Sequence, residues 1–141
     1  MARAKRYETD LVLGMMDLDH FKQINDQYGH PAEDMVLSEI GKMLKEYIRQ
    51  SDLICRYGGE EFAIILPNTR AENARKVCER FRAMVAEHQF EYHSMKFRIT
   101  VSMGIASYSR SIDQSPIELI KCADEALYQS KEAGRNRVVA Y

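Results

Sequence analysis

A short apolar run near the start of the chain constrains the fold more than any other feature. The run, LVLGMM, covers residues 11–16 and ends abruptly at Asp17. Unbroken apolar segments of this length are typical of strands buried on both faces, whereas a membrane-spanning helix needs about 18 or more such residues. The run therefore predicts a central strand in a sheet covered on both sides, with a carboxylate at its end.

The segments that follow alternate between helical and strand-like patterns. Residues 31–49 repeat apolar side chains at helical spacing with one wet face, which predicts a helix. Further helices are predicted over roughly residues 19–28, behind residues 69–72 with apolar side chains as far as Val85, and from residues 115–118 to near Gly134. Strand-like runs occupy residues 52–57, 62–66, 97–105 and 137–140. With the first strand, the order is β-α-α-β-β-α-β-α-β, which predicts an α/β fold of the α+β type: a mixed β-sheet covered by helices.

Local signals set the boundaries of these elements. Gly58-Gly59 between two strands predicts a tight hairpin whose glycines take positive φ. Thr69-Arg-Ala-Glu72 and Ser115-Pro-Ile-Glu118 have the form of capping boxes at helix starts. Apolar and polar residues alternate over residues 97–105, which predicts a strand with one covered face.

Composition limits the classes of protein that the chain can represent. Its 141 residues, 45% hydrophobic and 29% charged, suit one globular domain with a core. A net charge of −1 argues against charge-driven binding to nucleic acid or to a membrane surface, although a local basic site for a phosphate ligand is compatible with it. The three cysteines, Cys55, Cys78 and Cys122, are far apart and are interpreted as buried free thiols. Without a secretion signal or an apolar span, a cytoplasmic location is expected.

Acidic residues stand at two strand ends. Asp17 follows the first strand, and Glu60 and Glu61 follow the hairpin turn. If the hairpin neighbours the first strand, these carboxylates meet at one tip, where they repel each other and lose hydration. A divalent cation relieves both costs, and oxygen ligands without histidine favour magnesium. Each acid taken singly also fits a solvated strand end, so the residues alone leave both interpretations open.

Four motifs in order resemble the GGDEF family, the diguanylate cyclases. They read MDLDHFKQIND at residues 16–26, YGH at 28–30, RYGGEEF at 56–62 and SKEAGRN at 130–136. The resemblance extends from about residue 11 to the C-terminus, with the signature in its GGEEF form. It implies a palm-like fold, shared in outline with polymerases and adenylyl cyclases. It also implies that two GTP molecules are condensed into cyclic di-GMP and two pyrophosphates, by two-metal phosphoryl transfer across a homodimer.

The same resemblance implies roles for individual residues. The metal ligands are Asp17, the Leu18 carbonyl, Glu60 and Glu61, for two Mg²⁺ per site with Mn²⁺ as an alternative; Glu60 and Glu61 are the catalytic residues. Successive strand side chains point to opposite faces, so these two glutamates are expected to differ in role. The substrate contacts are Asn25 and Asp34 on the guanine edge, Lys22, Lys131 and Arg135 on the phosphates, and the adjoining His20, Phe21, Gly58 and Gly59.

Ordinary structural roles remain open for several of these residues. Asn25 also fits an exposed helix end, and Lys131 and Arg135 also fit compensation of a helix dipole. These two cations share one helical face only if the helix continues through Gly134. The side chain of His20 is interpreted as structural although it lies in the substrate-binding stretch.

A regulatory site is implied by a second, shorter motif. Arg49-Gln-Ser-Asp52 matches the R-x-x-D product-binding site of many family members, and Arg80 matches a third contributor. The resemblance therefore implies feedback inhibition by cyclic di-GMP. The motif is short, and an arginine that simply ends a helix is the alternative.

The chain departs from the family pattern in two places. The D-x-L-T-G-L-x-N-R segment that normally precedes the first strand is absent. We therefore expect residues 1–141 to be a single catalytic domain, separated from that segment and from any sensory or dimerisation domain of a larger sensor. Glu33 stands where the family usually has glycine. It would strain the backbone if its φ were positive, and it adds a negative charge beside the guanine pocket.

Three other functions compete with the cyclase. A receptor would bind cyclic di-GMP or GTP without turnover, but such proteins usually have a damaged signature. A cyclase of relaxed specificity would make a mixed GMP–AMP dinucleotide, although such relatives often have serine in place of Asp34. A purely structural or dimerisation domain leaves the clustered acids unexplained.

Overall fold

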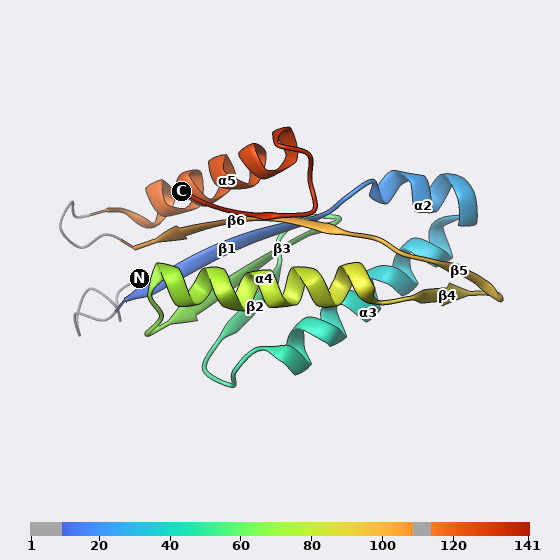
Figure 1. Ribbon diagram of the computed structural model, residues 1–141, viewed down its shortest axis with the longest axis horizontal. Helices are drawn as coiled ribbons and strands as arrows, with labels where there is room; N and C mark the ends of the chain where they lie inside the picture. Colours follow the sequence, from blue (N-terminus) through green and yellow to red (C-terminus); the bar gives the residue numbers. More distant parts are fainter. Residues whose placement is uncertain (1–9, 109–113) are drawn as a thin grey trace.

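A mixed β-sheet forms the centre of the molecule (Figure 1). The computed structural model describes residues 10–108 and 114–141, and within them the sheet has five strands in the order β2-β3-β1-β6-β7. All neighbours are antiparallel except β6 and β7. The strands are β1 (Leu11–Leu18), β2 (Leu53–Arg56), β3 (Glu61–Pro67), β6 (Val101–Ser107) and β7 (Val138–Ala140). The apolar run is thus the middle strand, and all its residues are buried as predicted.

Helices cover both faces of this sheet. Figure 1 shows α5 on one side of the sheet and α4 on the other, while α2 continues from β1 beyond the end of the sheet. Among the described residues the helices are α2 (Phe21–Tyr28), α3 (His30–Tyr47), α4 (Ala71–Glu87) and α5 (Pro116–Glu132). None of them has the length and apolarity that crossing a membrane requires.

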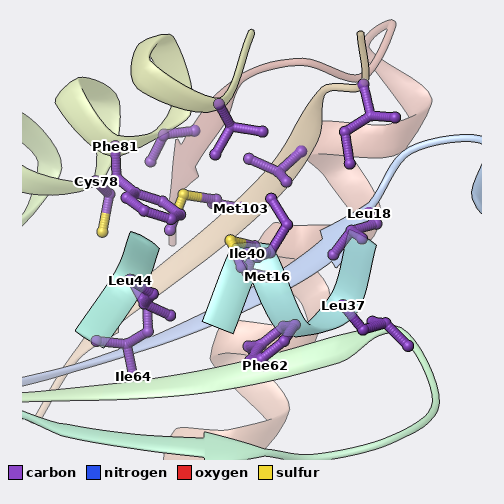
Figure 2. Packing of buried hydrophobic residues seen from close by; sticks show 14 of the residues in the cluster. Met16, Leu18, Leu37, Ile40, Leu44, Phe62, Ile64, Cys78, Phe81 and Met103 are labelled. Carbon is purple, nitrogen blue, oxygen red and sulfur yellow. The ribbon is translucent and has the colours of Figure 1, made fainter. Parts of the chain in front are cut away.

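Two apolar clusters fill the space on either side of the sheet. One joins the sheet to α3 and α4, and Figure 2 shows its central members: Met16, Leu18, Leu37, Ile40, Leu44, Phe62, Ile64, Cys78, Phe81 and Met103. The other joins the sheet to α5 and includes Leu11, Leu13, Met15, Leu119, Ala123 and Leu127. Even-numbered and odd-numbered side chains of β1 therefore enter different clusters. This alternation directs Asp17 toward the α5 side.

Gly104 in β6 allows α5 to lie directly on the sheet. A Cβ atom at this position would be 2.1 Å from the Leu127 backbone nitrogen and 2.6 Å from the Ala123 carbonyl oxygen. Only glycine leaves room for so close an approach of helix backbone to strand.

The prediction of one strand over residues 97–105 is wrong. Residues 95–97 form β5 (Met95–Phe97), which pairs only with β4 (Phe90–Tyr92) in a separate hairpin, and β6 begins at Val101. Phe97 stacks on Tyr28 of α2 at 4.8 Å and on Phe90 at 5.8 Å, so these contacts draw it away from the sheet. The observed order of elements therefore contains one hairpin, β4–β5 between α4 and β6, that the predicted order lacks. β6 itself is buried on both faces, not on one.

The hairpin between β2 and β3 forms as predicted, but its turn differs. Neither Gly58 nor Gly59 takes a left-handed φ. The backbone N–H groups of Tyr57 and Gly58 both donate to the Glu61 carbonyl, at 2.8 and 3.4 Å, and Arg56 donates to the Gly59 carbonyl at 2.7 Å. The chain turns through three residues, 58–60, rather than two, so the strict positive-φ requirement does not apply.

One of the two predicted capping boxes is present. The Ser115 hydroxyl accepts from the Glu118 N–H at 3.2 Å at the start of α5. The prediction for Thr69 is wrong, because Arg70 occupies the N-cap position of α4. The Thr69 hydroxyl instead donates to the Pro67 carbonyl at 2.9 Å and accepts from Arg49 at 2.8 Å.

All three cysteines are free thiols, as predicted, but they are not all buried. Cys78 is buried, and burial raises the pKa of its thiol to about 12. Cys122 is half-buried, and Cys55 on the edge strand β2 is exposed.

Candidate active site

Asp17, Glu60 and Glu61 lie at the same tip of the sheet. Asp17, near the end of β1, lies directly opposite Glu61 of β3 and Ser102 of β6. The Leu18 N–H donates to the Glu60 carbonyl at 3.3 Å, which ties the hairpin loop to the end of β1. The predicted convergence is confirmed because β1 and β3 are adjacent and antiparallel. Gly58 and Gly59 lie in the same loop.

The electrostatics of this tip favour a cation. Partial burial raises the pKa of Glu60 and of Glu61, and the nearby Asp17 carboxylate raises both further. The positive charge of Lys131 acts in the opposite direction and lowers the pKa of both glutamates. The two glutamates are thus held in a region where negative charge is disfavoured until a positive charge is added.

Lys131 provides part of that charge. It lies in the last turn of α5, and its ammonium donates to Oδ2 of Asp17, whose side chain is 6% exposed. Oδ1 of Asp17 is buried and has no hydrogen-bond partner among the described residues. A side-chain hydrogen bond to Asp17 helps to raise the pKa of Glu60, so Glu60 can donate to Asp17 only while it is protonated; once ionised it has no proton to give.

These residues fit a magnesium site that is not preformed. In the described part of the chain, no group of three or more His, Cys, Asp or Glu side chains already stands close enough to hold a metal. The donors are nevertheless hard oxygens, Oδ1 of Asp17 is unpartnered, and the raised pKa values of both glutamates mark a site that a cation would relieve.

Helix α2 follows this tip directly. It begins at Phe21 rather than Asp19, after His20, which takes a left-handed φ of 55° and makes no side-chain cap. No side chain caps the start of α2, and the Gln23 N–H donates to the His20 carbonyl at 3.0 Å, so the preceding N–H groups are the ones that could meet an anion. Phe21 is 7% exposed and belongs to the core, so only its backbone can reach a ligand, whereas Lys22 is exposed.

The two residues expected to read guanine lie on consecutive helices. Asn25 is half-buried on α2, and Asp34 is exposed on α3. Gly29, with a φ of 90°, joins the helices, and its N–H donates to the Asn25 carbonyl at 2.8 Å. The tight α2–α3 connection places both side chains near one helix junction.

Glu33 does not strain the backbone. It lies in the first turn of α3 and is not among the described residues with positive φ. Its Oε1 is 2.8 Å from Nδ1 of His30, and a carboxylate at a helix N-terminus is favoured by the helix dipole. The strain that a positive φ would have caused is therefore absent.

Restoring the family glycine is therefore expected to destabilise the domain. Glu33→Gly should cost about 1 kcal/mol, because glycine is a poor helix former. Thermal unfolding followed by circular dichroism would measure the loss, with Glu33→Ala as the control that removes only the carboxylate. A higher midpoint for the glycine variant would contradict this account of the position.

The turn after α5 separates the two expected phosphate-binding cations. The helix ends at Glu132, so Lys131 and Arg135 do not share a helical face. Gly134, Arg135 and Asn136 take φ values of 121°, 65° and 49°. Arg135 is exposed in this left-handed turn.

Asp19 is a residue that the sequence did not single out. It was expected only to begin a helix, yet it is 5% exposed and accepts hydrogen bonds from Thr100, Ser102 and the Asn136 N–H. The one sequence signal that could have pointed to Asp19 is its position two residues after Asp17, just past the end of the same strand.

The residues of the second motif line a separate pocket. Arg49, Asp52 and Arg80 border a cavity of about 320 Å³ between the end of α3 and α4. The Arg49 guanidinium donates to Asp52 at 2.8 Å, and this contact raises the pKa of Arg49. Asp52 is 3% exposed in its side chain, whereas Arg49 is 55% exposed. The buried carboxylate thus holds an arginine whose outer surface remains open to a ligand.

Comparison with known proteins first defines the class. The sequence model described as "Diguanylate cyclase, GGDEF domain" matches residues 1–137. The solved GGDEF domain of DgcB from Caulobacter crescentus, in complex with c-di-GMP, has a TM-score of 0.93 at 35% identity, covering 99% of this chain and 82% of that chain. The active GGEEF domain of a diguanylate cyclase from Vibrio cholerae has a TM-score of 0.91 at 38% identity, covering 99% and 88%. The fold is that of a GGDEF cyclase domain.

Proteins with similar sequences belong to the same class. Diguanylate cyclase A of Treponema denticola is 46% identical over 124 residues, which are 88% of this chain and 33% of that protein. DgcP of Pseudomonas aeruginosa is 42% identical over 138 residues, 98% of this chain and 20% of that protein. The chain thus spans a third or less of these relatives. It belongs to the GGDEF domain family.

Proposed function

We propose that this domain is the catalytic part of a diguanylate cyclase, condensing two GTP into cyclic di-GMP and two pyrophosphates. The observation that carries the proposal is the position of the GGEEF hairpin beside Asp17, whose buried Oδ1 has no partner among the described residues. Burying an unpaired carboxylate oxygen is costly, so its retention favours a ligand-binding role. The names of the relatives support the same reaction.

The chemistry consists of two equivalent displacements. In each, a 3′-hydroxyl attacks the α-phosphate of the opposite GTP, the new O–P bond forms, and pyrophosphate leaves in line. Glu60 is the proposed proton acceptor, since burial and Asp17 raise its pKa and so increase its affinity for a proton. Magnesium, two ions per site with manganese as the alternative, would be held by Asp17, the Leu18 carbonyl, Glu60 and Glu61 and would neutralise phosphate charge.

Other side chains would bind and orient the nucleotide. Asp34 accepts from guanine N1–H and N2–H₂, and Asn25 completes the contact with the base edge. The backbone N–H groups at the start of α2, from His20 to Lys22, and the loop at Gly58 and Gly59 would bind the phosphates. Lys131 and Arg135 supply positive charge from the opposite side.

Two domains must face each other for this reaction. Catalysis is then mostly the positioning of two bound nucleotides, so an isolated domain is expected to be nearly inactive. We propose that the element that pairs the domains, and a sensory partner domain, lie outside these 141 residues.

Incubation of a forced dimer with GTP and magnesium tests the function. Fusing the domain to a dimeric coiled coil should give pyrophosphate and cyclic dinucleotide in a ratio of two to one, measured by chromatography. GTP binding without either product would favour a receptor. Incorporation of AMP from competing ATP would indicate relaxed specificity. No magnesium-dependent binding of GTP at all would leave only a structural role.

We further propose that the pocket at Arg49, Asp52 and Arg80 binds cyclic di-GMP as a feedback inhibitor. The arginines can form paired hydrogen bonds with phosphates and guanines, and Asp52 already orients Arg49.

Arg49→Ala is expected to weaken cyclic di-GMP binding by roughly 100-fold, because a charge-assisted contact is lost. Titration calorimetry would measure the affinity, and thermal unfolding would check that the contacts of Arg49 with Pro67 and Thr69 are not essential for folding. Arg70→Ala, at an exposed arginine outside the pocket, is the control. Unchanged affinity in Arg49→Ala would remove the inhibitory site.

A further inference from the structure

The carboxylate of Asp19 is fully engaged, in contrast to that of Asp17. Oδ1 accepts from the Ser102 hydroxyl at 2.6 Å, and Oδ2 accepts from the Thr100 hydroxyl at 2.7 Å and from the Asn136 N–H at 3.0 Å. The Asp19 N–H donates in turn to the Thr100 carbonyl at 2.9 Å. A carboxylate with both oxygens occupied has little capacity left for a metal, so the two aspartates have different tasks.

The Asn136 contact matters because of the backbone that it holds. Gly134, Arg135 and Asn136 are all left-handed, which costs about 1 kcal/mol or more for each non-glycine residue. Such a turn persists only when its surroundings hold it. Without the acceptor on Asp19, the partly buried N–H of Asn136 would lose the hydrogen bond that holds it.

The same asparagine is held from a second side. Its Oδ1 accepts from Nη1 of Arg82 on α4 at 2.6 Å, and Glu79 binds the other edge of that guanidinium at 2.6 Å. Asp19 thus accepts a hydrogen bond from the main chain of Asn136, while Arg82 donates one to its side chain. We define this arrangement of Asp19, Asn136 and Arg82 as the turn clamp.

The turn clamp lies between two parts of the proposed active site. Asp19 follows the proposed metal ligands Asp17 and Leu18 in the chain, and Asn136 follows Arg135. Lys131, one turn earlier in α5, already contacts Asp17. The clamp therefore fixes the distance between the acidic tip and the segment that carries both cations.

We propose that Asp19 is a positioning residue: through the turn clamp it holds Arg135, and with it the end of α5, against the phosphates of the bound nucleotide. The inference rests on the proposed function, because it assumes that Arg135 meets phosphate. It predicts that loss of the clamp weakens recognition of the triphosphate and leaves recognition of the guanine unchanged.

Asp19→Ala is the sharpest test. It removes both carboxylate oxygens and therefore the acceptor for the Asn136 N–H, whereas an asparagine could turn its carbonyl oxygen toward that N–H and its NH₂ group toward the Ser102 hydroxyl. Calorimetry with a non-hydrolysable GTP analogue should show affinity reduced roughly 10- to 100-fold, by analogy with the loss of orienting partners at other sites. Affinity for guanosine, which has no phosphates, should stay within about twofold. Ser102→Ala is the matched control, since it removes a bond to Asp19 without touching the turn.

A double-variant cycle separates positioning from general stability. In an Arg135→Ala background the phosphate-selective effect of Asp19→Ala should nearly vanish, because both changes remove the same contact. Additive effects, or an equal loss for guanosine and the analogue, would overturn the proposal. If Asp19→Ala does not fold, Arg82→Gln opens the clamp from α4 and must show the same phosphate-selective loss, or the proposal fails.

The wild-type domain distinguishes this failure from failure of the proposed function. If the wild type binds the analogue no better than guanosine, the proposed function and the positioning role both fall. If the wild type prefers the analogue and Asp19→Ala keeps that preference, only the positioning role is contradicted.

Discussion

Glu60→Gln is expected to reduce product formation by about a thousand-fold or more while leaving the domain folded. The amide removes a negative charge from the acidic tip, so both the proposed cation binding and the proposed proton transfer are lost. The forced dimer incubated with GTP and magnesium provides the measurement. Glu91→Gln, at an exposed glutamate of β4, is the control for a change of charge elsewhere.

Glu60→Gln is expected to lower the activity of the domain but to raise its thermal stability. Burial and Asp17 raise the pKa of Glu60, so the folded state binds its proton more tightly than the unfolded state. Stability therefore decreases as the pH rises from the ordinary carboxyl range through this raised pKa. Above it, Glu60→Gln should unfold at a higher temperature than the wild type without metal. This difference should disappear in acid, where the glutamate is protonated in both states.

Two results would contradict this account of Glu60. One is substantial cyclase activity in the variant. The other is an equal gain in thermal stability on adding magnesium to the variant and to the wild type, which would mean that the carboxylate does not bind the ion.

Gly104→Ala is expected to cost at least about 3 kcal/mol, a large fraction of the roughly 5–15 kcal/mol that stabilises a typical domain. The added Cβ would lie 2.1 Å from a backbone nitrogen of α5, and no side-chain rotation can relieve a contact with main chain. The helix must move off the sheet, which opens the cluster of Leu11, Met15 and Leu127.

Urea denaturation followed by circular dichroism would measure the change. Gly41→Ala on α3 is the matched control, because its Cβ would be 3.8 Å from the nearest atom of Phe62 and should stabilise the helix by about 1 kcal/mol. Equal midpoints for Gly104→Ala and the wild type would show that α5 does not lie so close to β6.

The sequence predicted the central architecture well because the signals for it are local. The apolar run of β1, the glycine pair before Glu60 and the helical spacing of α3 each depend on neighbouring residues. These signals placed Asp17 and Glu61 at strand ends, and sheet pairing then brought them together.

The errors arose where distant residues decided the outcome. Thr69 does not cap α4 because Arg49, 20 residues earlier, binds its hydroxyl. The β4–β5 hairpin depends on the stacking of Phe97 against Tyr28 of another element. Asp19 was overlooked because its partners Thr100, Ser102 and Asn136 are 81, 83 and 117 residues away. Periodicity and turn motifs carry no information about such contacts.

The exposed thiol of Cys55 makes the pairing of two domains directly measurable. Cys78 is buried and resists ionisation, so maleimide reagents will select Cys55 once the half-buried Cys122 is replaced by serine. A spin label there would sit on β2, the strand that leads into the GGEEF loop. Electron–electron distance measurements between two labelled copies would then follow their approach as GTP is added, independently of turnover.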